Sequence, residues 1–375
     1  MHYESISITK PLLPKFEELE EEIKEILSTG QITNGKYVSI IESLVAEYIG
    51  VKQVVAVSSC TLGLILALQS AGLKGKIIIP SFTFSATGHS LWWNGLEPVF
   101  VDCCPNTFNI DVTKIEEQLT EDVSGILAVH IFGNPADVKE LEKIAHKYNL
   151  YLLFDAAHGF GGTFDGKTLG SFGDAEVFSL SPTKLLVAGE GGLITTNNRE
   201  LANKIRIARN YGDPGTYNCK NIGLNARMSE FHAILAIKSL PLVKKNIYRR
   251  QSIVQRYIKN LSNIPGISFQ QINPQAESTF KDFSILIDRD KFGMDRDSLA
   301  DILMSKNISS RRYFYPPLHR QDVYRKYFSQ YDKLLPNTNY VSFNILNLPI
   351  YFGLTEEMVD YISEIVIYAH KQYQP

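Results

Sequence analysis

Seven short apolar runs, separated by segments with helical spacing, limit the fold of this chain more than any other feature of its sequence. Several of them lack the alternation of apolar and polar residues that marks a half-exposed strand, so we expect strands covered on both faces. Strands that alternate with helices predict an α/β fold, in which a mostly parallel seven-stranded sheet carries helices on both sides. The runs cover residues 54–57, 77–79, 99–101, 126–131, 151–154, 177–180 and 193–195.

The helices are indicated by apolar residues spaced three and four apart. The first helix stops at Gly30 and the second near Gly50, because glycine commonly ends helices. Two more helices follow Met228, and the second of them, which starts at Pro241, is long and basic on its outer face. The three amphipathic helices expected in the first half of the chain cover residues 14–28, 38–48 and 138–148.

The chain has 375 residues, which exceeds the usual limit for a single core, so we expect two domains. We place the boundary inside the long helix, near residue 245. This gives a large domain over residues 1–245 and a smaller C-terminal domain over residues 246–375. The smaller domain should also be α/β, with strands at 279–287 and before Pro349 and helices at 297–305 and 355–371.

Charged residues of both signs are interspersed, and the formal net charge is −2. There is no basic face for nucleic acid and no polybasic patch for a membrane, so a small polar or anionic ligand is expected. The N-terminus lacks the pattern of a signal peptide, and no apolar run approaches about 18 residues. We therefore expect a soluble, cytoplasmic protein.

The four cysteines are Cys60, Cys103, Cys104 and Cys219. They form no CxxC pair and show no His/Cys spacing typical of a zinc site. We expect reduced thiols, most of them buried, and no bound metal.

The best candidates for catalytic residues are an acid at the end of one predicted strand and a lysine just after the next one. The run 151–154 ends on Asp155, and Lys184 follows twenty-nine residues later, beyond the run 177–180. Alone, such an aspartate is usually a helix cap and such a lysine is usually solvated. Together they are what a pyridoxal phosphate site needs, a lysine for the Schiff base and a carboxylate that keeps the pyridine nitrogen protonated.

The segments DAAH, GSFGDAEVFSLSPTK and GEGGLITTN resemble the DegT/DnrJ/EryC1/StrS family of fold-type I sugar aminotransferases. The resemblance extends over nearly the whole chain. It implies that pyridoxal 5′-phosphate is the cofactor, that Lys184 forms the Schiff base and that Asp155 contacts the pyridine nitrogen. Ser181 departs from the family pattern, which often has histidine there.

After the strand predicted at 54–57, small polar residues and then a helix follow in SSCTLGLILAL, residues 58–68. The free N–H groups and positive end of such a helix bind dianions, although an ordinary capped helix has the same pattern. The resemblance places Ser59, Cys60 and Thr61 on the cofactor phosphate, with Ser179 as a further phosphate ligand. Family members usually have glycine where Cys60 stands.

The resemblance implies that Phe84 and His158 contact the cofactor. Phe84 aligns with the aromatic residue that stacks on the pyridine ring, although Phe82 and Phe84 also suit a core. His158 lies where the family has glutamine or histidine near the cofactor, and otherwise it would be a structural histidine. Histidine there is associated with 4-aminotransferases and glutamine with 3-aminotransferases, so His158 favours a 4-keto sugar.

The segment GLNARMSE resembles a family motif whose asparagine reaches the cofactor phosphate of a partner subunit. Asn225 then implies a homodimer with a shared active site. Ordinary polar contacts at a helix start are the alternative. In RRYFYPPLHRQDVY, the candidates for the nucleotide or sugar side of the cleft are Arg311, Arg312, Tyr313 and His319.

The predicted function is transamination, in which Lys184 moves protons while an amino group passes from glutamate to a nucleotide-linked keto sugar. The preferred acceptor is a 4-keto-6-deoxyhexose on dTDP or GDP, and a 3-keto sugar is the alternative. A sugar dehydratase of the same fold typically has histidine in place of Lys184. A non-catalytic, cofactor-binding regulator stays open. A dinucleotide loop is excluded because Phe164 stands where GxGxxG requires its third glycine.

Overall fold

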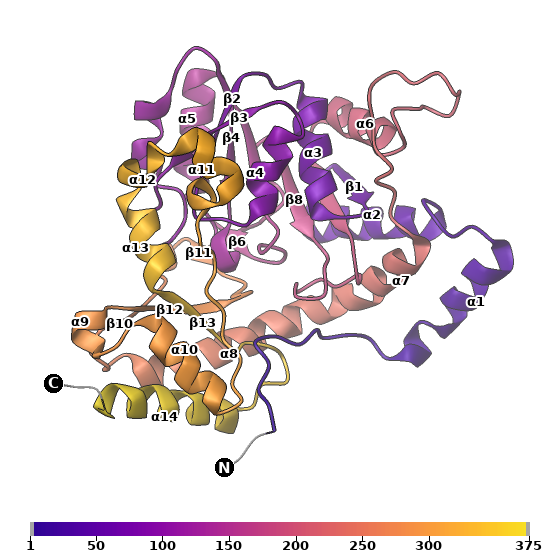
Figure 1. The fold of residues 1–375 in the computed structure, drawn as a ribbon. Helices are drawn as coiled ribbons and strands as arrows, with labels where there is room; N and C mark the ends of the chain where they lie inside the picture. Colours follow the sequence, from indigo (N-terminus) through magenta and orange to yellow (C-terminus); the bar gives the residue numbers. More distant parts are fainter. Residues whose placement is uncertain (1–3, 373–375) are drawn as a thin grey trace.

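The computed structural model describes residues 4–372 and contains the predicted seven-stranded sheet (Figure 1). The strand order is β1-β9-β8-β5-β4-β2-β3. All neighbours from β8 to β3 are parallel, whereas β9 runs antiparallel to both β1 and β8. The bounds are β1 Gln53–Val57, β2 Lys76–Pro80, β3 Glu97–Val101, β4 Val123–Val129, β5 Tyr151–Asp155, β8 Ala175–Ser179 and β9 Gly192–Thr196. The prediction of a mostly parallel sheet is confirmed.

Helices cover both faces of this sheet, as its apolar strands require. Successive residues of β1 separate the two cores: Val54 and Ala56 pack with α2, α5 and α7, whereas Val55 and Val57 pack with α3, α4 and α6. The helices are α1 Glu20–Thr29, α2 Lys36–Ile49, α3 Cys60–Ala71, α4 Ser85–Trp92, α5 Val138–Tyr148, α6 Arg199–Ala208 and α7 Glu230–Ser239. The predicted helices at 14–28, 38–48 and 138–148 correspond to α1 with its preceding turn, α2 and α5.

The long helix α8, Val243–Leu261, leads to a second, antiparallel sheet in the order β10-β12-β13 (Figure 1). Its strands are β10 Ile267–Phe269, β12 Phe283–Ile287 and β13 Ile345–Leu348, and the helices α10 Arg296–Ser305 and α14 Glu356–Gln372 contribute to the same core. The strand predicted at 279–287 begins only at Phe283, because residues 279–281 pair with the turn at 132–133 instead.

Two segments make contacts across the domain boundary that we propose near residue 245. At the N-terminus, Ile6 forms a bridge with Ile308. In the C-terminal part, Leu318 and Tyr324 pack into one core of the large sheet. The outermost residues of the two proposed domains, 1–3 and 373–375, lie outside the described range.

Further short elements complete the described chain. Three helices between residues 320 and 345 were not predicted from the sequence, namely α11 Asp322–Phe328, α12 Tyr331–Leu334 and α13 Pro336–Asn344. The others are α9 Arg289–Phe292, β6 Thr163–Phe164, β7 Lys167–Thr168 and β11 Ala276–Glu277, and the 3₁₀ turns Phe16–Glu18, Val112–Lys114, Glu116–Gln118, Ile131–Gly133, Leu240–Leu242 and Leu318–Arg320.

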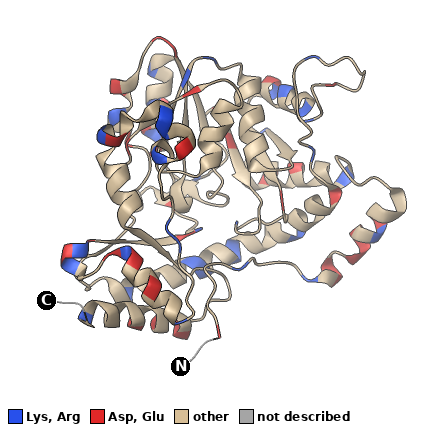
Figure 2. Cartoon of the chain, in the orientation of Figure 1, with Lys and Arg blue, Asp and Glu red and all other residues tan. Residues whose placement is uncertain are grey.

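Charged residues of both signs are distributed over most of the helices (Figure 2). None of the helices within residues 4–372 is long and apolar enough to cross a membrane.

Candidate active site

Asp155 and Lys184 meet at one edge of the large sheet. Asp155 is the last residue of β5, and Lys184 lies in the turn that follows β8. Because β5 and β8 are parallel neighbours, their carboxyl ends lie side by side. Both side chains line one cavity of about 340 Å³. The sequence predicted that these two residues belong to the same site.

The Asp155 carboxylate is held in a fixed orientation inside the protein. Its side chain is buried, with 4% of the residue exposed. The Thr87 hydroxyl donates to Oδ2 at 2.7 Å, and the Ala157 N–H donates to Oδ1 at 3.1 Å. Burial raises the pKa of Asp155, while these hydrogen bonds and the charge of Lys184 oppose that rise. The carboxylate would be stabilised by a cationic N–H group placed in the cavity.

Lys184 carries an amine with no hydrogen bond or ion pair to any described side chain. Loss of water around the amine lowers the pKa of Lys184 to about 8, and the positive charge of Lys281 contributes to the shift. A lysine with this pKa is partly unprotonated at neutral pH. It can therefore act as a nucleophile and as a base.

His158 is a neutral hydrogen-bond donor at the cavity wall. Its Nδ1 accepts the N–H of Phe132 at 3.2 Å, so the ring proton of the neutral form resides on Nε2. Its ring stacks on Phe132 and on Phe314, with centroids 6.3 and 6.4 Å away. Burial holds the pKa of His158 well below its usual value. The residue therefore offers an N–H and no charge.

The predicted phosphate residues lie together at the start of α3. Ser59 caps this helix, with its side chain accepting the Leu62 N–H at 3.2 Å. Cys60 and Thr61 are the first two helical residues, so their N–H groups have no acceptor within the helix. Ser179, at the end of β8, lines the same cavity. A dianion in this corner would receive several N–H and hydroxyl donors.

Phe82 and Phe84 have different environments. Phe82 is fully buried against other phenylalanines, as a core residue should be. Phe84 lines the cavity with 59% of its residue surface exposed. An exposed aromatic ring beside Asp155 and Lys184 is suited to covering a flat heterocycle.

The predicted substrate residues divide into two groups. Arg311 and Tyr313 line the cavity. Arg312 is exposed and forms an ion pair with Asp297, away from the cavity lining. His319 is fully buried and bonds Ser81 and Asn339, so it is a structural residue here.

Asn225 does not line the cavity of its own chain. It is exposed and forms a backbone bridge with Asn210. Its neighbour Arg227 donates to the Asn210 side chain at 3.1 Å.

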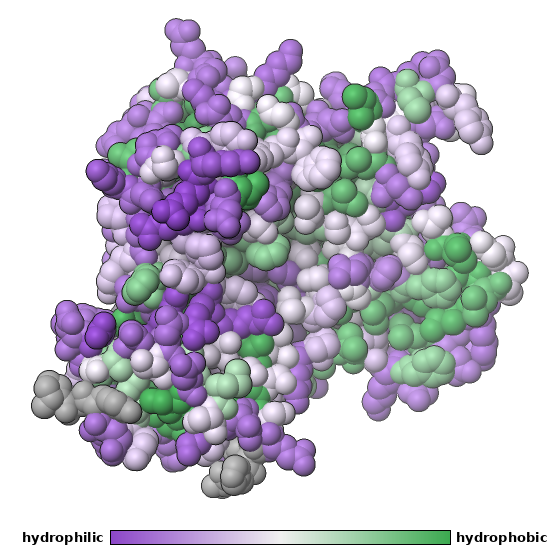
Figure 3. All heavy atoms as spheres, viewed as in Figure 1, coloured by the Kyte–Doolittle hydropathy of each residue, from purple (hydrophilic) through white to green (hydrophobic). Residues whose placement is uncertain are grey.

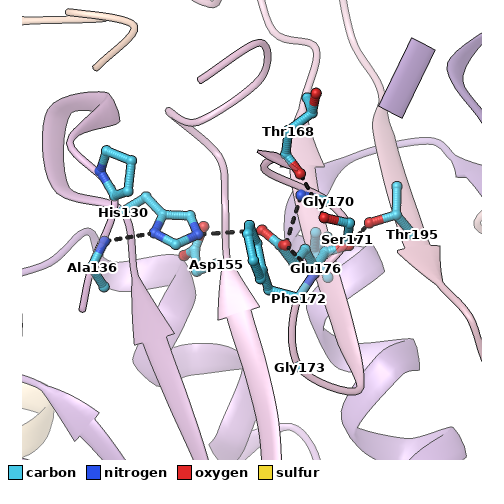
Figure 4. A network of polar contacts seen from close by, with 12 residues as sticks. His130, Ala136, Asp155, Thr168, Gly170, Ser171, Phe172, Gly173, Glu176 and Thr195 are labelled. Atoms are coloured by element: carbon cyan, nitrogen blue, oxygen red, sulfur yellow. Dashed lines mark hydrogen bonds and ion pairs between the residues drawn. The ribbon is translucent and has the colours of Figure 1, made fainter. Parts of the chain in front are cut away.

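A buried polar network supports Asp155 from behind (Figure 4). The backbone N–H of His130 donates to the backbone carbonyl of Asp155 at 3.3 Å. The ring Nδ1 of His130 accepts the Ala136 N–H at 3.0 Å. Because Nδ1 is an acceptor, the proton on Nε2 points toward Glu176 at 3.2 Å. The other Glu176 oxygen accepts N–H groups of Gly170 and Phe172 at 2.6 and 2.9 Å. Full satisfaction of these buried groups fixes the ends of β4 and β5.

Ser181, which departs from the family pattern, also lines the cavity. Other lining residues were not proposed as site residues from the sequence, namely Thr83, Ala86, Val129, Ala157, Thr183, Glu190, Lys281 and Phe314. Lys281 is the least expected, because its segment was predicted to be a strand. Thr279 donates its N–H to the Gly133 carbonyl at 3.1 Å and its hydroxyl to the His158 carbonyl at 2.8 Å. These bonds dock the C-terminal segment onto the site.

We predict that Gly133→Ala destabilises the protein more than Gly30→Ala. Both glycines have positive φ, 86° and 70°, which costs an alanine about 1–2 kcal/mol. At Gly30 an added Cβ would meet open space, whereas at Gly133 it would lie 1.9 Å from the Thr279 hydroxyl oxygen. We expect a loss of about 3–5 kcal/mol for Gly133→Ala, measured by urea unfolding at one protein concentration. Equal losses for both variants would contradict this docking.

The residues present fit pyridoxal phosphate. The cavity combines a lysine with an unengaged amine, a buried carboxylate suited to a protonated ring nitrogen, an exposed aromatic ring and a helix start suited to a phosphate. In contrast, no group of three or more His, Cys, Asp or Glu side chains within residues 4–372 is arranged to hold a metal ion. The four cysteines are free, with Cys60 and Cys103 buried and Cys219 exposed.

Comparison with known proteins agrees with this geometry. The profile of the DegT/DnrJ/EryC1/StrS aminotransferase family matches residues 15–367. A dTDP-4-amino-4,6-dideoxy-D-glucose transaminase of Escherichia coli is 34% identical over 98% of this chain and 99% of its own length. A GDP-perosamine synthase of Caulobacter vibrioides is 31% identical, with 95% of each chain covered.

Solved structures are similar over almost the whole chain. DesI in the presence of its TDP-sugar product is 31% identical with a TM-score of 0.92, covering 99% of this chain and 94% of DesI. The ntda protein of Bacillus subtilis, with bound cofactor PMP, is 27% identical with a TM-score of 0.87, covering 95% of this chain and 82% of ntda. This chain belongs to the DegT/DnrJ/EryC1/StrS family of pyridoxal phosphate-dependent aminotransferases.

Proposed function

We propose that this protein transfers an amino group from glutamate to a 4-keto-6-deoxyhexose linked to dTDP or GDP. The observation that carries the proposal is the meeting of Lys184 and Asp155 in one cavity beside the exposed ring of Phe84. The relatives that act on dTDP- and GDP-linked amino sugars support the nucleotide-sugar class. His158, rather than glutamine, supports the 4-keto position.

Pyridoxal phosphate, when bound, supplies an electron sink that stabilises negative charge on the substrate carbon. The chain's own residues orient and tune it. Asp155 would accept the ring N–H and keep that nitrogen charged, and Phe84 would cover the ring. His158 would offer its Nε2–H to an oxygen substituent of the ring. The start of α3 and Ser179 would hold the phosphate.

Lys184 moves the protons in both halves of the reaction. In the first half its neutral amine removes the proton from the α-carbon of the donor. In the second half its ammonium returns a proton to the sugar carbon that receives nitrogen. The pKa of about 8 suits both tasks, because the two protonation states coexist near neutral pH.

The outer part of the cavity should hold the nucleotide. Arg311 is exposed there, and its guanidinium lies 6.0 Å from the centre of the Tyr313 ring. A guanidinium binds phosphate oxygens through two parallel N–H groups. We therefore assign the sugar diphosphate to Arg311.

We also propose that the active unit is a homodimer. Large apolar side chains are exposed on and around α1 (Figure 3), where Leu13, Phe16, Leu27 and Ile32 are each about half or more exposed. A patch of this kind typically marks a protein interface. A second copy would cover it, and the exposed Asn225 could then reach the partner's cofactor phosphate.

Asn225→Ala should weaken cofactor binding about tenfold, the loss expected for one hydrogen bond to a charged group. Titration of the apoenzyme with pyridoxal phosphate measures the dissociation constant, and sedimentation confirms that the dimer persists. Asn203→Ala, on the exposed side of α6, is the matched control and should bind normally. Unchanged affinity in Asn225→Ala would argue against a site completed by the partner.

A panel assay tests the proposed function. The holoenzyme is given glutamate and 3-keto or 4-keto 6-deoxy sugars linked to dTDP, UDP or GDP, and the amino sugar is identified by mass spectrometry and NMR. We expect turnover of a dTDP- or GDP-linked 4-keto sugar. If only 3-keto sugars were turned over, the amino group would be added at carbon 3 and the 4-keto assignment would be wrong. If no sugar of the panel were aminated, a non-catalytic homologue would be favoured.

A further inference from the structure

A second lysine, Lys281, lines the cavity that contains Lys184. Its side chain is only 3% exposed, and its ammonium pairs with both oxygens of the Asp282 carboxylate at 2.9 and 3.0 Å. Lysine is seldom this buried, because desolvating an ammonium is unfavourable even when a partner is present. Stability alone therefore does not explain a buried pair in a cavity wall.

The backbone holds Lys281 in this position. Its N–H donates to the Phe132 carbonyl at 3.0 Å. The guanidinium of Arg250, with 1% of that residue exposed, donates to the carbonyls of Phe280 and Lys281 at 3.1 and 2.8 Å. Phe280 has a φ of 44°, a conformation that non-glycine residues adopt mainly where the surroundings enforce it. The chain thus turns before β12 begins, and residue 281 reaches the cavity.

The cavity wall offers cationic donors to an anion. Lys281 and Arg311 line it together with the amine of Lys184, and the acids nearby are Asp155 and Glu190 in the lining and Asp282, which is paired with Lys281. An ammonium has three N–H donors, so Lys281 can keep its bonds to Asp282 and still donate to a ligand.

The two substrates of a transamination carry their negative charges at different depths. The α-carboxylate of an amino acid is attached to the carbon that Lys184 deprotonates, so it must bind deep in the cavity. The diphosphate of a sugar nucleotide is separated from the keto carbon by the sugar ring, so it lies farther out. Lys281 is buried, whereas Arg311 is exposed.

We propose that Lys281 binds the α-carboxylate of the amino donor. This inference rests on the proposed function and deepens it by restricting the donor to α-amino acids. The same space receives the anionic donor first and the uncharged sugar ring second. Asp282 balances the charge of Lys281 during the second stage, when no carboxylate is present.

The two half-reactions provide the test. The donor half is followed by the absorbance change when the pyridoxal form of the holoenzyme meets glutamate. The acceptor half is followed by the reverse change when the pyridoxamine form meets the keto sugar. In the double variant Lys281→Met/Asp282→Asn, which removes both charges and leaves none unpaired, we expect the donor half to slow about 100-fold. The acceptor half should change less than about threefold.

Two further variants serve as controls. Arg311→Met should show the opposite pattern, with a slower acceptor half and a normal donor half. Lys281→Arg, which keeps the charge, should recover part of the donor rate. The rate with 4-aminobutyrate, which lacks the α-carboxylate, should be the same in the wild type and in the double variant.

The inference would be overturned by an equal loss in both half-reactions, because Lys281 would then act through the fold. It would also be overturned by a shifted pH–rate profile with an unchanged KM for glutamate, because Lys281 would then act through Lys184. An unchanged donor half would overturn it as well. If the wild-type holoenzyme did not react with glutamate at all, the proposed function itself would fail. A wild type that reacts, with a double variant that reacts equally, refutes only the role of Lys281.

Discussion

Replacing Lys184 by alanine should lower the rate of amine transfer by at least about 10⁴-fold, the upper range for loss of a general base. The effect is expected to be this large because, in the proposed mechanism, the same amine forms the covalent bond to the cofactor and moves the proton in both half-reactions. Its low pKa, about 8, depends on its position in the cavity. Steady-state assays with glutamate and the keto sugar measure the loss, and the visible absorbance of covalently held cofactor should disappear.

Lys184→Arg is the matched control for charge. A guanidinium stays protonated and cannot replace the amine as nucleophile or base. The arginine variant should therefore be as inactive as the alanine variant, while both bind cofactor reversibly. Activity above about one per cent of wild type in purified Lys184→Ala would end the assignment of Lys184 as the catalytic base.

Replacing Asp155 by alanine or asparagine should reduce the rate roughly 10³-fold, a loss typical of removing one preorganised electrostatic partner. The buried carboxylate is the group that can keep the pyridine nitrogen protonated, and an uncharged side chain cannot. The α3 start and Ser179 remain, so some cofactor should still bind. Rates and cofactor affinity are measured on the same preparation, so that the two effects can be separated.

Thr87→Val gives a graded control for the role of Asp155. It removes the hydroxyl that donates to Oδ2 at 2.7 Å but leaves the carboxylate in place. We expect a loss of about tenfold, since one hydrogen bond to a charged group is removed. A Thr87→Val rate as low as that of Asp155→Asn would show that orientation, rather than charge, is what Asp155 requires.

The large sheet could be predicted from the sequence, because its strands are buried on both faces and several of them are apolar without regular alternation. The run before Asp155 and the run before Lys184 became the parallel neighbours β5 and β8. The direction of β9 could not be inferred from its run, because an apolar strand has the same composition in either direction. The helices at 322–344 were missed because Leu318 and Tyr324 pack on distant parts of the chain.

The site could be predicted wherever its residues are adjacent in the sequence to strand ends or to a helix start. The cavity brings together Asp155, Lys184, Phe84 and the start of α3. The position of Lys281 could not be predicted, because the segment 279–287, apolar in its second half, was interpreted as one strand and contains no glycine or proline to indicate a turn. That turn depends on contacts with Arg250 and Phe132, which lie far away in sequence.

The most direct test is to reduce the holoenzyme with borohydride, digest it and locate the cofactor by peptide mass mapping. Reduction makes the bond between the cofactor aldehyde and a lysine amine permanent, so the modified residue can be read from the fragments. We predict one cofactor per chain, attached to Lys184. Attachment to Lys281, or a chain that carries no cofactor on any lysine, would contradict it.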